Sequence, residues 1–598
     1  MLPISRPLGF LFLCAALALS SGLSTPAHAQ ALTIGSPNVA VADPLVPRPP
    51  STPCAVNLFS NQQFADFSSK PFSYAPPAAC PGPWQKVVLS ADFNVTAGRQ
   101  FDRTGEIWLG GAVIYFGTTQ EPSATVAPSW HIERDLTDYS ALFATAAGGH
   151  TDLGNFVGVS GGVTYDGIIY GSATLYFYPV VPDDGDTSLA PRPDAVLPVT
   201  TSSSGGTATL VRPADQLSVT FTTLPTNIER AYLDVYAQGQ YLDEFWFFDL
   251  PDDIAPLFFD TGSTAFKETL VTIDGAPAGI APIYPWIFTG GADPILWRPI
   301  PGVQTLAFEP YRVDLTPFVG VLDDGNPHTL ALSVYNAANY FSAAANLLLY
   351  QDHGSSTVTG AVTANTLNAT PVVNVNENVV SQPDGSAAGS VSVTSNRAFS
   401  IAGTANTSHG LVTTQIDTTI AFSSVQQLAI SDTVYSQDTV QNTNIDATTT
   451  RTAGKKASVV HEQRSYPLTF DYDDVFAADG TETLHTLVDQ EFKQQVDAGV
   501  RGNTAKTARR DNHVVSTVTR HYDADGNLVS TPATASQTYT YADPFGACYS
   551  RKVSAQDRLL SAVADGAGCP GGHNHLTWHD QFAYFVSAGW GATVKLLP

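Results

Sequence analysis

Neighbouring acidic and aromatic residues in the middle of the chain are the feature of this sequence best suited to chemistry. Asp243 and Glu244 stand between GQYL, which is typical of a turn, and the apolar run FWFF. Successive side chains of a β-strand point to opposite faces, so a strand that begins here would place Glu244 and Trp246 on one face and Asp243 on the other. Carboxylates beside aromatic rings at the rim of a sheet are common in carbohydrate sites, and they are also common as solvated strand ends.

A second pair of charges, Asp102 and Arg103, directly precedes the apolar stretch GEIWLGGAVIYFG, which contains Trp108. The two adjacent glycines in this stretch indicate a bulge or the close approach of another chain. An acid and a base at the mouth of a strand can form a reactive pair, and they can equally form a structural turn.

Two further stretches carry charges that could contact a polar ligand. The segment WHIERDLTDY contains Glu133 and Asp135, and it can also be interpreted as the start of a helix or turn with acids near its N-terminal end. The segment GGADPILWRPIPG presents Trp297 and Arg298 on a loop that three prolines stiffen. A guanidinium beside an indole suits a polar ligand, and a packed Ω-loop would have the same composition.

Histidines near the C-terminus raise the question of a metal. His573, His575 and His579 lie in GGHNHLTWHDQ, and a His-x-His pair on a strand can chelate zinc. No carboxylate or cysteine completes a familiar pattern, so we predict no metal. The motifs GxSxG and HExxH, the P-loop and a helix-opening GxGxxG are absent from the sequence. The sequence therefore favours a carboxylate-dependent hydrolase that needs no cofactor.

Short alternating runs separated by Gly, Pro, Asp and Asn are the main signal for secondary structure. Examples are KVVLSADFNV, SATLYFYPVV, QLSVTFTTL and RAYLDVYAQ. Strands of this kind, with turns about every ten residues, are typical of antiparallel sandwiches and jelly rolls. Residues 358–470 alternate as well, but are rich in Thr, Ser and Asn, which predicts a sandwich with a polar outer face. One weak helix candidate is LHTLVDQEFKQQVDA, over 484–498.

The fold that these runs predict is all-β. We expect two adjoining antiparallel jelly-roll or β-sandwich domains and a further β-rich C-terminal domain. Soft boundaries fall where Pro, Asp, Ser and Gly gather, near 181–215 and 352–358. The predicted parts are a signal peptide at 1–29, a Pro-rich arm at 30–84, a first jelly roll at 85–215, a second at 216–355 and the C-terminal domain at 356–598.

Charge and the N-terminal segment limit the partners and the compartment. With 54 acidic residues against 28 Lys and Arg, the net charge is −26, which argues against nucleic acid and anionic membranes as partners. Arg6, the apolar run GFLFLCAALAL and the small residues of Ala27-His28-Ala29 match a cleavable export signal. No later segment has the ~18 consecutive apolar residues of a membrane span. We therefore predict a secreted or periplasmic monomer.

Four cysteines remain once Cys14 is removed with the signal: Cys54, Cys80, Cys548 and Cys569. In an oxidising compartment these are expected to form disulfides. Proximity in the sequence favours Cys54–Cys80 and Cys548–Cys569, although four cysteines allow three pairings.

Several long segments, taken in order, resemble the peptide:N-glycanase A family of acid-active glycoamidases. The matching segments are FDRTGEIWLGGAVIYFGTTQEP, WHIERDLTDYSALF, ATLYFYPV, LPTNIERAYLDVYA, DEFWFFDLP and IFTGGADPILWRPIPGVQTLAFEPYRVDLTPF. The resemblance covers roughly residues 85–350. A fainter similarity connects the chain to PNGase F, a smaller bacterial enzyme of the same activity that is built from two jelly rolls.

This resemblance implies roles for individual residues. It makes Asp102 the principal catalytic residue and Glu244 the assisting one, and it leaves Asp243 as a rim or capping acid. A further glutamate of PNGase F has no match after DLTDY, where Asp152 and Asn155 are poor substitutes. The candidate substrate-contacting residues are Arg103, Trp108, Glu133, Asp135, Asp243, Trp246, Trp297 and Arg298.

The activity that the resemblance implies is hydrolysis of the amide that joins the innermost N-acetylglucosamine to asparagine in N-glycosylated peptides and glycoproteins. An acidic optimum and the absence of a metal belong to the same expectation. Two alternatives stay open on the residues alone. One is a glycosidase, which would also use two carboxylates. The other is a glycan-binding sandwich without turnover.

Overall fold

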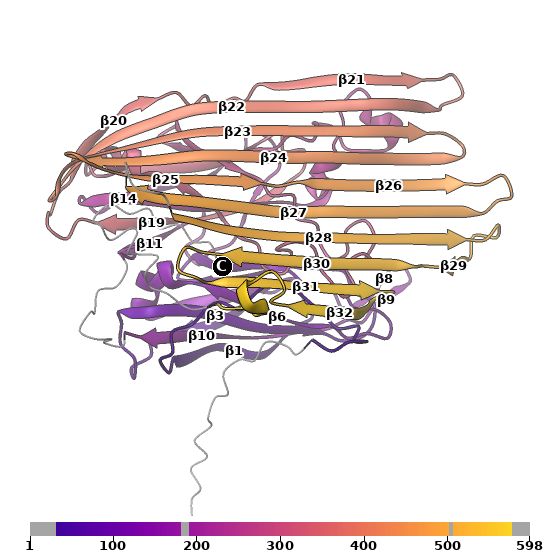
Figure 1. Cartoon of the computed structure of the whole chain (residues 1–598), viewed down its shortest axis with the longest axis horizontal. Helices are drawn as coiled ribbons and strands as arrows, with labels where there is room; N and C mark the ends of the chain where they lie inside the picture. The colour runs from indigo at the N-terminus through magenta and orange to yellow at the C-terminus, as the bar shows by residue number, and fades with distance from the viewer. Residues whose placement is uncertain (1–31, 181–190, 501–505, 577–598) are drawn as a thin grey trace, which may run out of the picture.

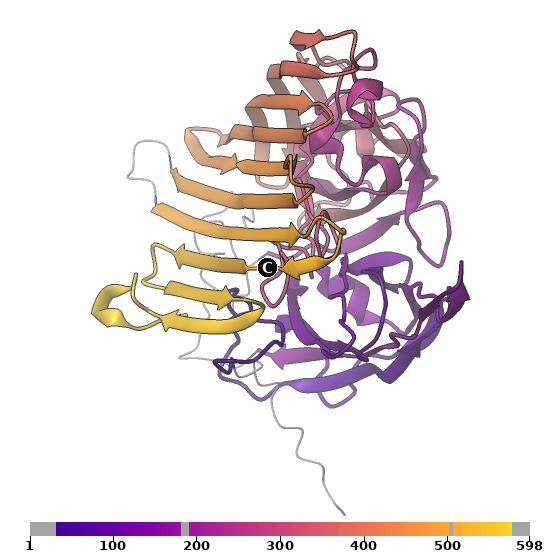
Figure 2. The same ribbon diagram turned by 90° about the vertical axis from the view of Figure 1, so that its right-hand side faces the viewer.

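Strands account for most of the architecture of this protein. The computed structural model describes residues 32–180, 191–500 and 506–576. In these residues two antiparallel sandwiches lie next to each other, and one broad sheet lies against both (Figures 1 and 2). The predicted all-β fold, with two sandwiches and a β-rich C-terminal region, is confirmed. None of the helices in the described residues has the length and apolar character needed to cross a membrane.

The first sandwich is built from two four-stranded sheets between residues 54 and 179. The first sheet has the strand order β1 (Cys54–Phe64), β10 (Ile169–Pro179), β3 (Trp84–Val95) and β6 (Ser129–Asp135). The second has the order β2 (Lys70–Tyr74), β7 (Ala147–Leu153), β4 (Thr104–Leu109) and β5 (Ala112–Thr118). A 3₁₀ segment, η1 (Thr137–Ala144), follows β6, as the DLTDY motif predicted. A small hairpin of β8 (Gly158–Ser160) and β9 (Val163–Tyr165) stands apart from both sheets.

The second sandwich repeats this plan between residues 195 and 351. One sheet has the order β11 (Ala195–Val199), β19 (Phe341–Gln351), β14 (Ile228–Gly239) and β17 (Tyr311–Asp314), with β12 (Ala208–Leu210) also on β19. The other has the order β13 (Leu217–Phe221), β18 (His328–Tyr335), β15 (Glu268–Ile273) and β16 (Ala276–Pro282). Its short helical segments are η2 (Tyr241–Asp243), η3 (Trp246–Phe248), η4 (Ala255–Phe258), η5 (Thr316–Phe318) and α1 (Val319–Leu322).

The two sandwiches share a buried interface that fixes their relative positions. The N–H of Phe308, in the segment between β16 and β17, donates to the carbonyl of Phe116 in β5 at 2.8 Å. The guanidinium of Arg312 bonds both Asp138 of the first sandwich and Asp234 of the second, with N–O distances of 2.7–2.9 Å. The segments that contain Phe308 and Arg312 are therefore bonded to the first sandwich as well as to their own.

The C-terminal region forms a single sheet of thirteen strands within the described residues, where we had predicted a sandwich. Its strands are β20 (Thr359–Asn365), β21 (Val373–Ser381), β22 (Ala387–Thr407), β23 (Gly410–Ile430), β24 (Val434–Ala453), β25 (Lys456–Ser465), β26 (Leu468–Phe476), β27 (Glu482–Val500), β28 (Lys506–Tyr522), β29 (Leu528–Ser530), β30 (Ala533–Ala542), β31 (Cys548–Gln556) and β32 (Leu559–Asp565). The predicted helix at 484–498 is wrong, because these residues belong to β27.

The buried face of this large sheet is unusually polar, because it covers loops rather than a second sheet. Gln437 donates to the carbonyl of Phe248 at 3.0 Å, and Gln490 donates to that of Pro285 at 2.6 Å. Arg510 makes a two-bond ion pair with Glu309 at 2.7 and 2.8 Å. Buried carbonyls need such donors, which explains why glutamine alternates with Val and Phe on these strands.

The N-terminal segment ties the large sheet to the first sandwich. The N–H of Ala42 donates to Gln537 of β30 at 2.6 Å, and the N–H of Val46 donates to Glu133 of β6 at 2.9 Å. Residues 32–53, which belong to the predicted arm, contain no strand. However, β1 and β2 lie inside the range 30–84 and are strands of the first sandwich.

Both favoured disulfides are present. Cys54 at the start of β1 is bonded to Cys80, and Cys548 at the start of β31 is bonded to Cys569. The predicted signal peptide and part of the 181–215 boundary lie outside the described residues.

Candidate active site

Asp102 lies at the junction of the two sandwiches, two residues before β4 begins. Its Oδ2 accepts a hydrogen bond from the N–H of Gly290 at 3.1 Å, and Gly290 belongs to the segment between β16 and β17 of the second sandwich. The N–H of Asp102 donates to Oε1 of Glu121 at 3.3 Å. Asp102, which we predicted to be catalytic, is therefore bonded through its carboxyl group to the second sandwich and through its backbone N–H to the first.

Glu121 is a second carboxyl at the same place. It follows β5 closely, and only 7% of its surface is exposed. A Cβ built on Gly290 would lie 2.5 Å from Oε1 of Glu121 and 2.9 Å from Oδ1 of Asp102. Residue 290 must therefore be glycine for these two carboxyl groups to remain neighbours. The N–H of Glu121 also donates to Oγ1 of Thr289 at 3.3 Å, which fastens the loop after β5 to the second sandwich.

Glu244 is the third carboxyl group of this site, and it belongs to the second sandwich. It follows η2, at the point where β14 has ended and the chain turns. Gln240, in the same turn, donates to Oγ1 of Thr104 at 2.8 Å, and Thr104 is the first residue of β4. This bond places the turn of the second sandwich beside the segment that carries Asp102. The described residues provide no hydrogen bond to the carboxyl group of Glu244.

The three carboxyl groups affect one another electrostatically. Burial raises the pKa of Glu244 to about 7, and the negative charge of Asp102 contributes further to this rise. Burial and then the charge of Asp102 likewise raise the pKa of Glu121 to about 7. Burial also raises the pKa of Asp102, although the N–H of Gly290 and the charge of Arg103 oppose that rise. Hydrogen-bond donors and arginine charges therefore favour the ionised forms of Asp102 and Glu121, whereas Glu244 has no such contacts in the described residues.

Two arginines border the carboxyl groups. Arg298 donates from Nη2 to the carbonyl of Pro122 at 2.6 Å and approaches Oε2 of Glu121 at 3.5 Å. Arg103 donates to Oε1 of Gln100 at 2.9 Å. The Nε–H of each of these arginines is buried and has no protein partner in the described residues. Both guanidinium groups, which the sequence marked as substrate contacts, therefore retain donors that they could offer to a ligand.

The prediction that a strand begins at Asp243 is wrong. Asp243 and Glu244 nevertheless have different surroundings. Residues 241–243 and 246–248 are 3₁₀ turns, and the strand β14 ends before them at Gly239. Asp243 is fully buried and accepts backbone N–H bonds from Ala338 at 2.9 Å and Asn339 at 2.6 Å. It therefore caps an inner loop, whereas the pKa of Glu244 responds to the charge of Asp102.

The three tryptophans that we predicted to contact substrate have their indole rings in the core. Trp108 is fully buried, and its Nε1–H donates to Glu106 at 2.8 Å. Trp297 is fully buried as well, and its Nε1–H donates to the carbonyl of Gly291 at 2.8 Å. Trp246 packs in the hydrophobic core of the second sandwich. The prediction failed because large aromatic rings next to charged residues stabilise the loop itself.

The acids of β6 are engaged elsewhere. Glu133 accepts hydrogen bonds from Arg48 and from the N–H of Val46, both in the N-terminal segment. Asp135 forms an ion pair with Lys86 at 2.7 Å. These contacts assign both side chains to holding the N-terminal segment and β3, which corrects their predicted role at the substrate.

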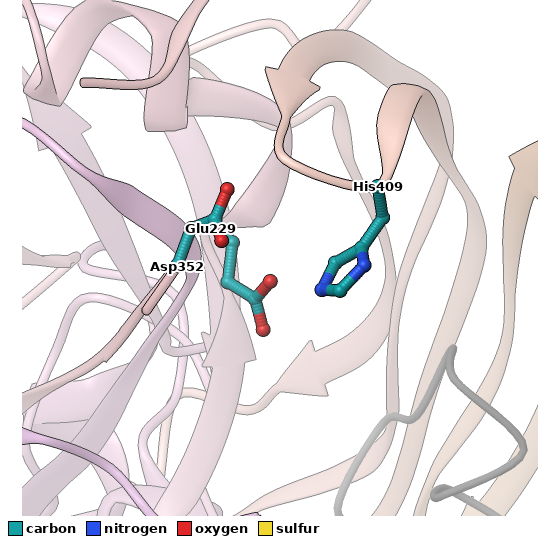
Figure 3. Close-up of side chains that lie close together, drawn as sticks. All are labelled: Glu229, Asp352 and His409. Atoms are coloured by element: carbon teal, nitrogen blue, oxygen red, sulfur yellow. The ribbon is translucent and has the colours of Figure 1, made fainter. Parts of the chain in front are cut away.

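Asp102, Glu121 and Glu244 are called the carboxyl cluster below. Two groups that could hold a metal consist of other residues. The rings of His573 and His575 are 4.0 Å apart, and His579 lies outside the described residues. Glu229, Asp352 and His409 come together with ligand atoms within 4.8 Å of one another (Figure 3). However, Asp352 already accepts hydrogen bonds from the N–H and Oγ of Ser408, which join the β22–β23 turn to the second sandwich.

Reasoning from the sequence missed Glu121, and a signal for it existed. Antiparallel pairing of β4 with β5 sets Thr104 opposite Thr118, so residues just before β4 and just after β5 lie at one end of the hairpin. An acid within three residues of the end of β5 should therefore have been considered together with Asp102.

A family model matches the part of the chain that contains this site. The model described as "Peptide N-acetyl-beta-D-glucosaminyl asparaginase amidase A" matches residues 44–368, which is more than half of the chain and includes every residue of the carboxyl cluster. The chain belongs to this family. Membership in this amidase A family makes it an enzyme of the peptide-N-glycosidase class.

Individual relatives agree with this membership. A peptide-N4-(N-acetyl-beta-glucosaminyl)asparagine amidase A from Prunus dulcis is 26% identical over 548 residues, covering 87% of this chain and 91% of that protein. Among solved structures, PNGase F from Flavobacterium meningosepticum aligns with a TM-score of 0.32 and 15% identity, over 50% of this chain and 96% of its own. PNGF-II aligns with a TM-score of 0.33 and 13% identity, over 50% of this chain and 65% of its own.

Proposed function

We propose that this protein hydrolyses the amide between asparagine and the innermost N-acetylglucosamine of N-glycosylated peptides and glycoproteins. The observation that carries the proposal is the convergence of Asp102, Glu121 and Glu244 at the junction of two sandwiches, with the pKa of each raised. Buried carboxyl groups with strongly shifted pKa values are typical of acid–base sites.

Asp102 acts as the general base. Its contacts with the Gly290 N–H and the Arg103 charge favour its carboxylate form, and Glu244 has no such contacts in the described residues. In this role it takes a proton from a water molecule, which then attacks the side-chain carbonyl carbon of the glycosylated asparagine. A positioned base of this kind contributes about 10²–10⁴-fold to the rate.

Glu244 acts as the proton donor. Its pKa of about 7 leaves it protonated in mildly acidic solution, and no protein donor occupies its carboxyl group in the described residues. As the C–N bond breaks, it protonates the leaving nitrogen. The products are an aspartate in the peptide and a glycosylamine, which then loses ammonia in water.

Arg298 and Arg103 stabilise the developing oxyanion. Each has a buried Nε–H without a protein partner among the described residues, and both lie beside the carboxyl cluster. Donors fixed before the reaction act more strongly in a water-poor site than in solution. Both arginines are among the residues that the sequence marked as substrate contacts.

Export and an acidic working range complete the proposal. Two disulfides, Cys54–Cys80 and Cys548–Cys569, support an oxidising compartment. The raised pKa of Glu244 supports an acid optimum, because activity should fall once the pH exceeds about 7 and this group ionises.

The test is to incubate purified protein with a defined N-glycopeptide and to weigh both products. We expect the peptide to gain the mass difference between asparagine and aspartate, and the whole glycan to be released with both core N-acetylglucosamines. A peptide that keeps one sugar would instead identify a glycosidase. Binding without any change of mass would identify a glycan-binding protein.

A further inference from the structure

Large apolar side chains are exposed at only one place on the described first sandwich, residues 54–179. Phe67, Phe101 and Val159 are 71%, 51% and 67% exposed, and all three lie around the β8–β9 hairpin. Val159 is the middle residue of β8. Phe67 covers Gly154, where a Cβ would lie 2.7 Å from its ring. Apolar residues that gather on one part of a surface mark an interaction site more often than residues that are scattered singly.

The exposed side chains are connected by a row of rings. The ring centroids of Phe101 and Tyr165 are 5.3 Å apart, and those of Tyr165 and Phe156 are 5.8 Å apart. Phe67 joins this group through its contact with Gly154, which is two residues before Phe156 in the chain. We call Phe101, Tyr165, Phe156 and Phe67 the aromatic strip.

The hairpin is fixed relative to the catalytic segment. Gly161 and Gly162 have φ angles of 58° and 79°, which the tight turn between β8 and β9 requires and which glycine adopts without strain. Beyond the hairpin, the carboxyl group of Asp166 accepts the N–H of Arg99 at 2.8 Å, and the N–H of Gly167 donates to the carbonyl of Arg99 at 3.1 Å. Residues 99–103 and the strip thus form one rigid surface.

Arg103 connects this surface to the carboxyl cluster. Its guanidinium carbon lies 5.6 Å from the ring centroid of Phe101. The charges that act on its guanidinium are those of Asp102, Glu121 and Tyr165. The first ring of the strip is therefore adjacent in the chain to Asp102, and the strip leads away from that residue across the first sandwich.

We propose that the aromatic strip is a subsite for the sugars of the N-glycan that lie beyond the chitobiose core. This inference rests on the proposed function, because the strip begins at Phe101, which is adjacent in the chain to the residue assigned as base. Sugar rings have apolar C–H faces that stack on aromatic rings, and Arg99, Arg103 and Asp166 border the strip with groups that can bond hydroxyls. A row of several rings suits an elongated glycan better than a peptide, for which the shorter exposed pair Tyr241–Leu242 lies beside Glu244.

The experiment compares two substrates with the same peptide, one with an oligomannose glycan and one trimmed to chitobiose. In Phe67→Ala and Tyr165→Leu, we expect KM for the oligomannose substrate to rise roughly tenfold, the scale of one aromatic contact, with kcat unchanged. KM for the trimmed substrate should not change. Phe259→Ala is the matched control, because Phe259 is an 88% exposed phenylalanine of the second sandwich, and it should alter neither value.

The outcomes separate this inference from the proposed function. An equal rise of KM for both substrates, or a rise that follows the length of the peptide, would overturn the subsite. If the wild-type protein released neither glycan, the proposed function would fail instead. In that case, calorimetric titration with free oligomannose and free chitobiose still tests the strip, which requires tighter binding of the longer sugar and loss of that preference in Tyr165→Leu.

Discussion

Asp243 and Glu244 are neighbours in one turn, and the structure gives them opposite surroundings. Two backbone N–H groups donate to Asp243, and the ammonium group of Lys267 lies 3.8 Å away. Glu244 has no protein donor in the described residues, and burial together with the charge of Asp102 raises its pKa to about 7. Donors from the protein occupy the carboxyl group of Asp243, whereas the carboxyl group of Glu244 is available to a ligand.

This difference offers a criterion for separating structural from functional acids. Burial alone does not distinguish them, since Asp243 is the more buried of the two. What distinguishes them is whether donors from the protein complete the carboxyl group, because an uncompensated buried acid costs stability and is kept only where something else requires it. By this criterion Glu121 belongs with Glu244. Its carboxyl group accepts one backbone N–H at 3.3 Å, and Nη2 of Arg298 lies 3.5 Å away.

The largest effect is expected at Asp102, whose charge contributes to the raised pKa of Glu244. Asp102→Asn keeps an oxygen that can accept the Gly290 N–H but removes the base, so kcat should fall about 10²–10⁴-fold. The melting temperature should stay close to that of the wild type, because the amide has nearly the same size and keeps an acceptor for the Gly290 N–H. Steady-state kinetics and calorimetry on the same preparation measure both quantities. Near-normal turnover would remove Asp102 from the mechanism.

Asp243→Asn should act on stability instead. The amide would present N–H groups to the backbone donors of residues 338 and 339 and would leave the buried Lys267–Asp249 pair without its second acid. Breaking a buried charged arrangement costs about 3–5 kcal/mol. Denaturant unfolding should show that loss, while the pH at which kcat/KM is maximal stays where it is in the wild type. A shifted pH profile with unchanged stability would reverse the roles of the two acids.

Glu244→Gln should give the inverse pattern. We expect a fall in kcat/KM of about 10²-fold, because the amide cannot protonate the leaving nitrogen. The decline of kcat/KM near pH 7 should disappear from whatever activity remains, since that decline reports ionisation of Glu244. A pH–rate profile that extends about two units on either side of the pKa of about 7 measures this. Retention of the decline in the variant would assign it to Glu121 or Asp102.

Local alternation in the sequence was sufficient to predict the sandwiches, because one face of each strand packs on a core. It failed where tertiary contacts decide the conformation. The run FWFF after Glu244 has strand propensity, yet it forms a 3₁₀ turn because Phe247 and Phe248 pack on Phe470 of the large sheet, with ring centroids 5.9 and 4.6 Å apart. A partner 220 residues away in sequence cannot be seen in a local pattern.

The candidate site was predictable only in part for the same reason. Asp102 and Glu244 were marked by their neighbours and by family resemblance. Glu121 was hidden in QEP, because its role depends on hairpin register and on the missing Cβ of Gly290 in another domain. The three tryptophans were marked by residue type, which does not reveal whether a ring faces the core or a ligand.

The smallest effect concerns stability as a function of pH. Glu121 and Glu244 each have a pKa of about 7 in the folded protein against 4.5 for an ordinary glutamate, so the folded state holds their protons over a range where the unfolded chain releases them. Their contribution to stability is therefore full below pH 4.5 and is lost as the pH rises through 7.

Glu121→Gln and Glu244→Gln should each reduce the fall in melting temperature over that range and should exceed the wild type in stability above pH 7. Calorimetric scans across this range decide the point. Asp243→Asn provides the contrast, because it keeps both glutamates and should therefore keep the fall in melting temperature that the wild type shows as the pH rises through 7. If the glutamine variants paralleled the wild type instead, these carboxyl groups would be ionised in the folded protein, and the distinction between Glu244 and Asp243 would rest on their hydrogen bonds alone.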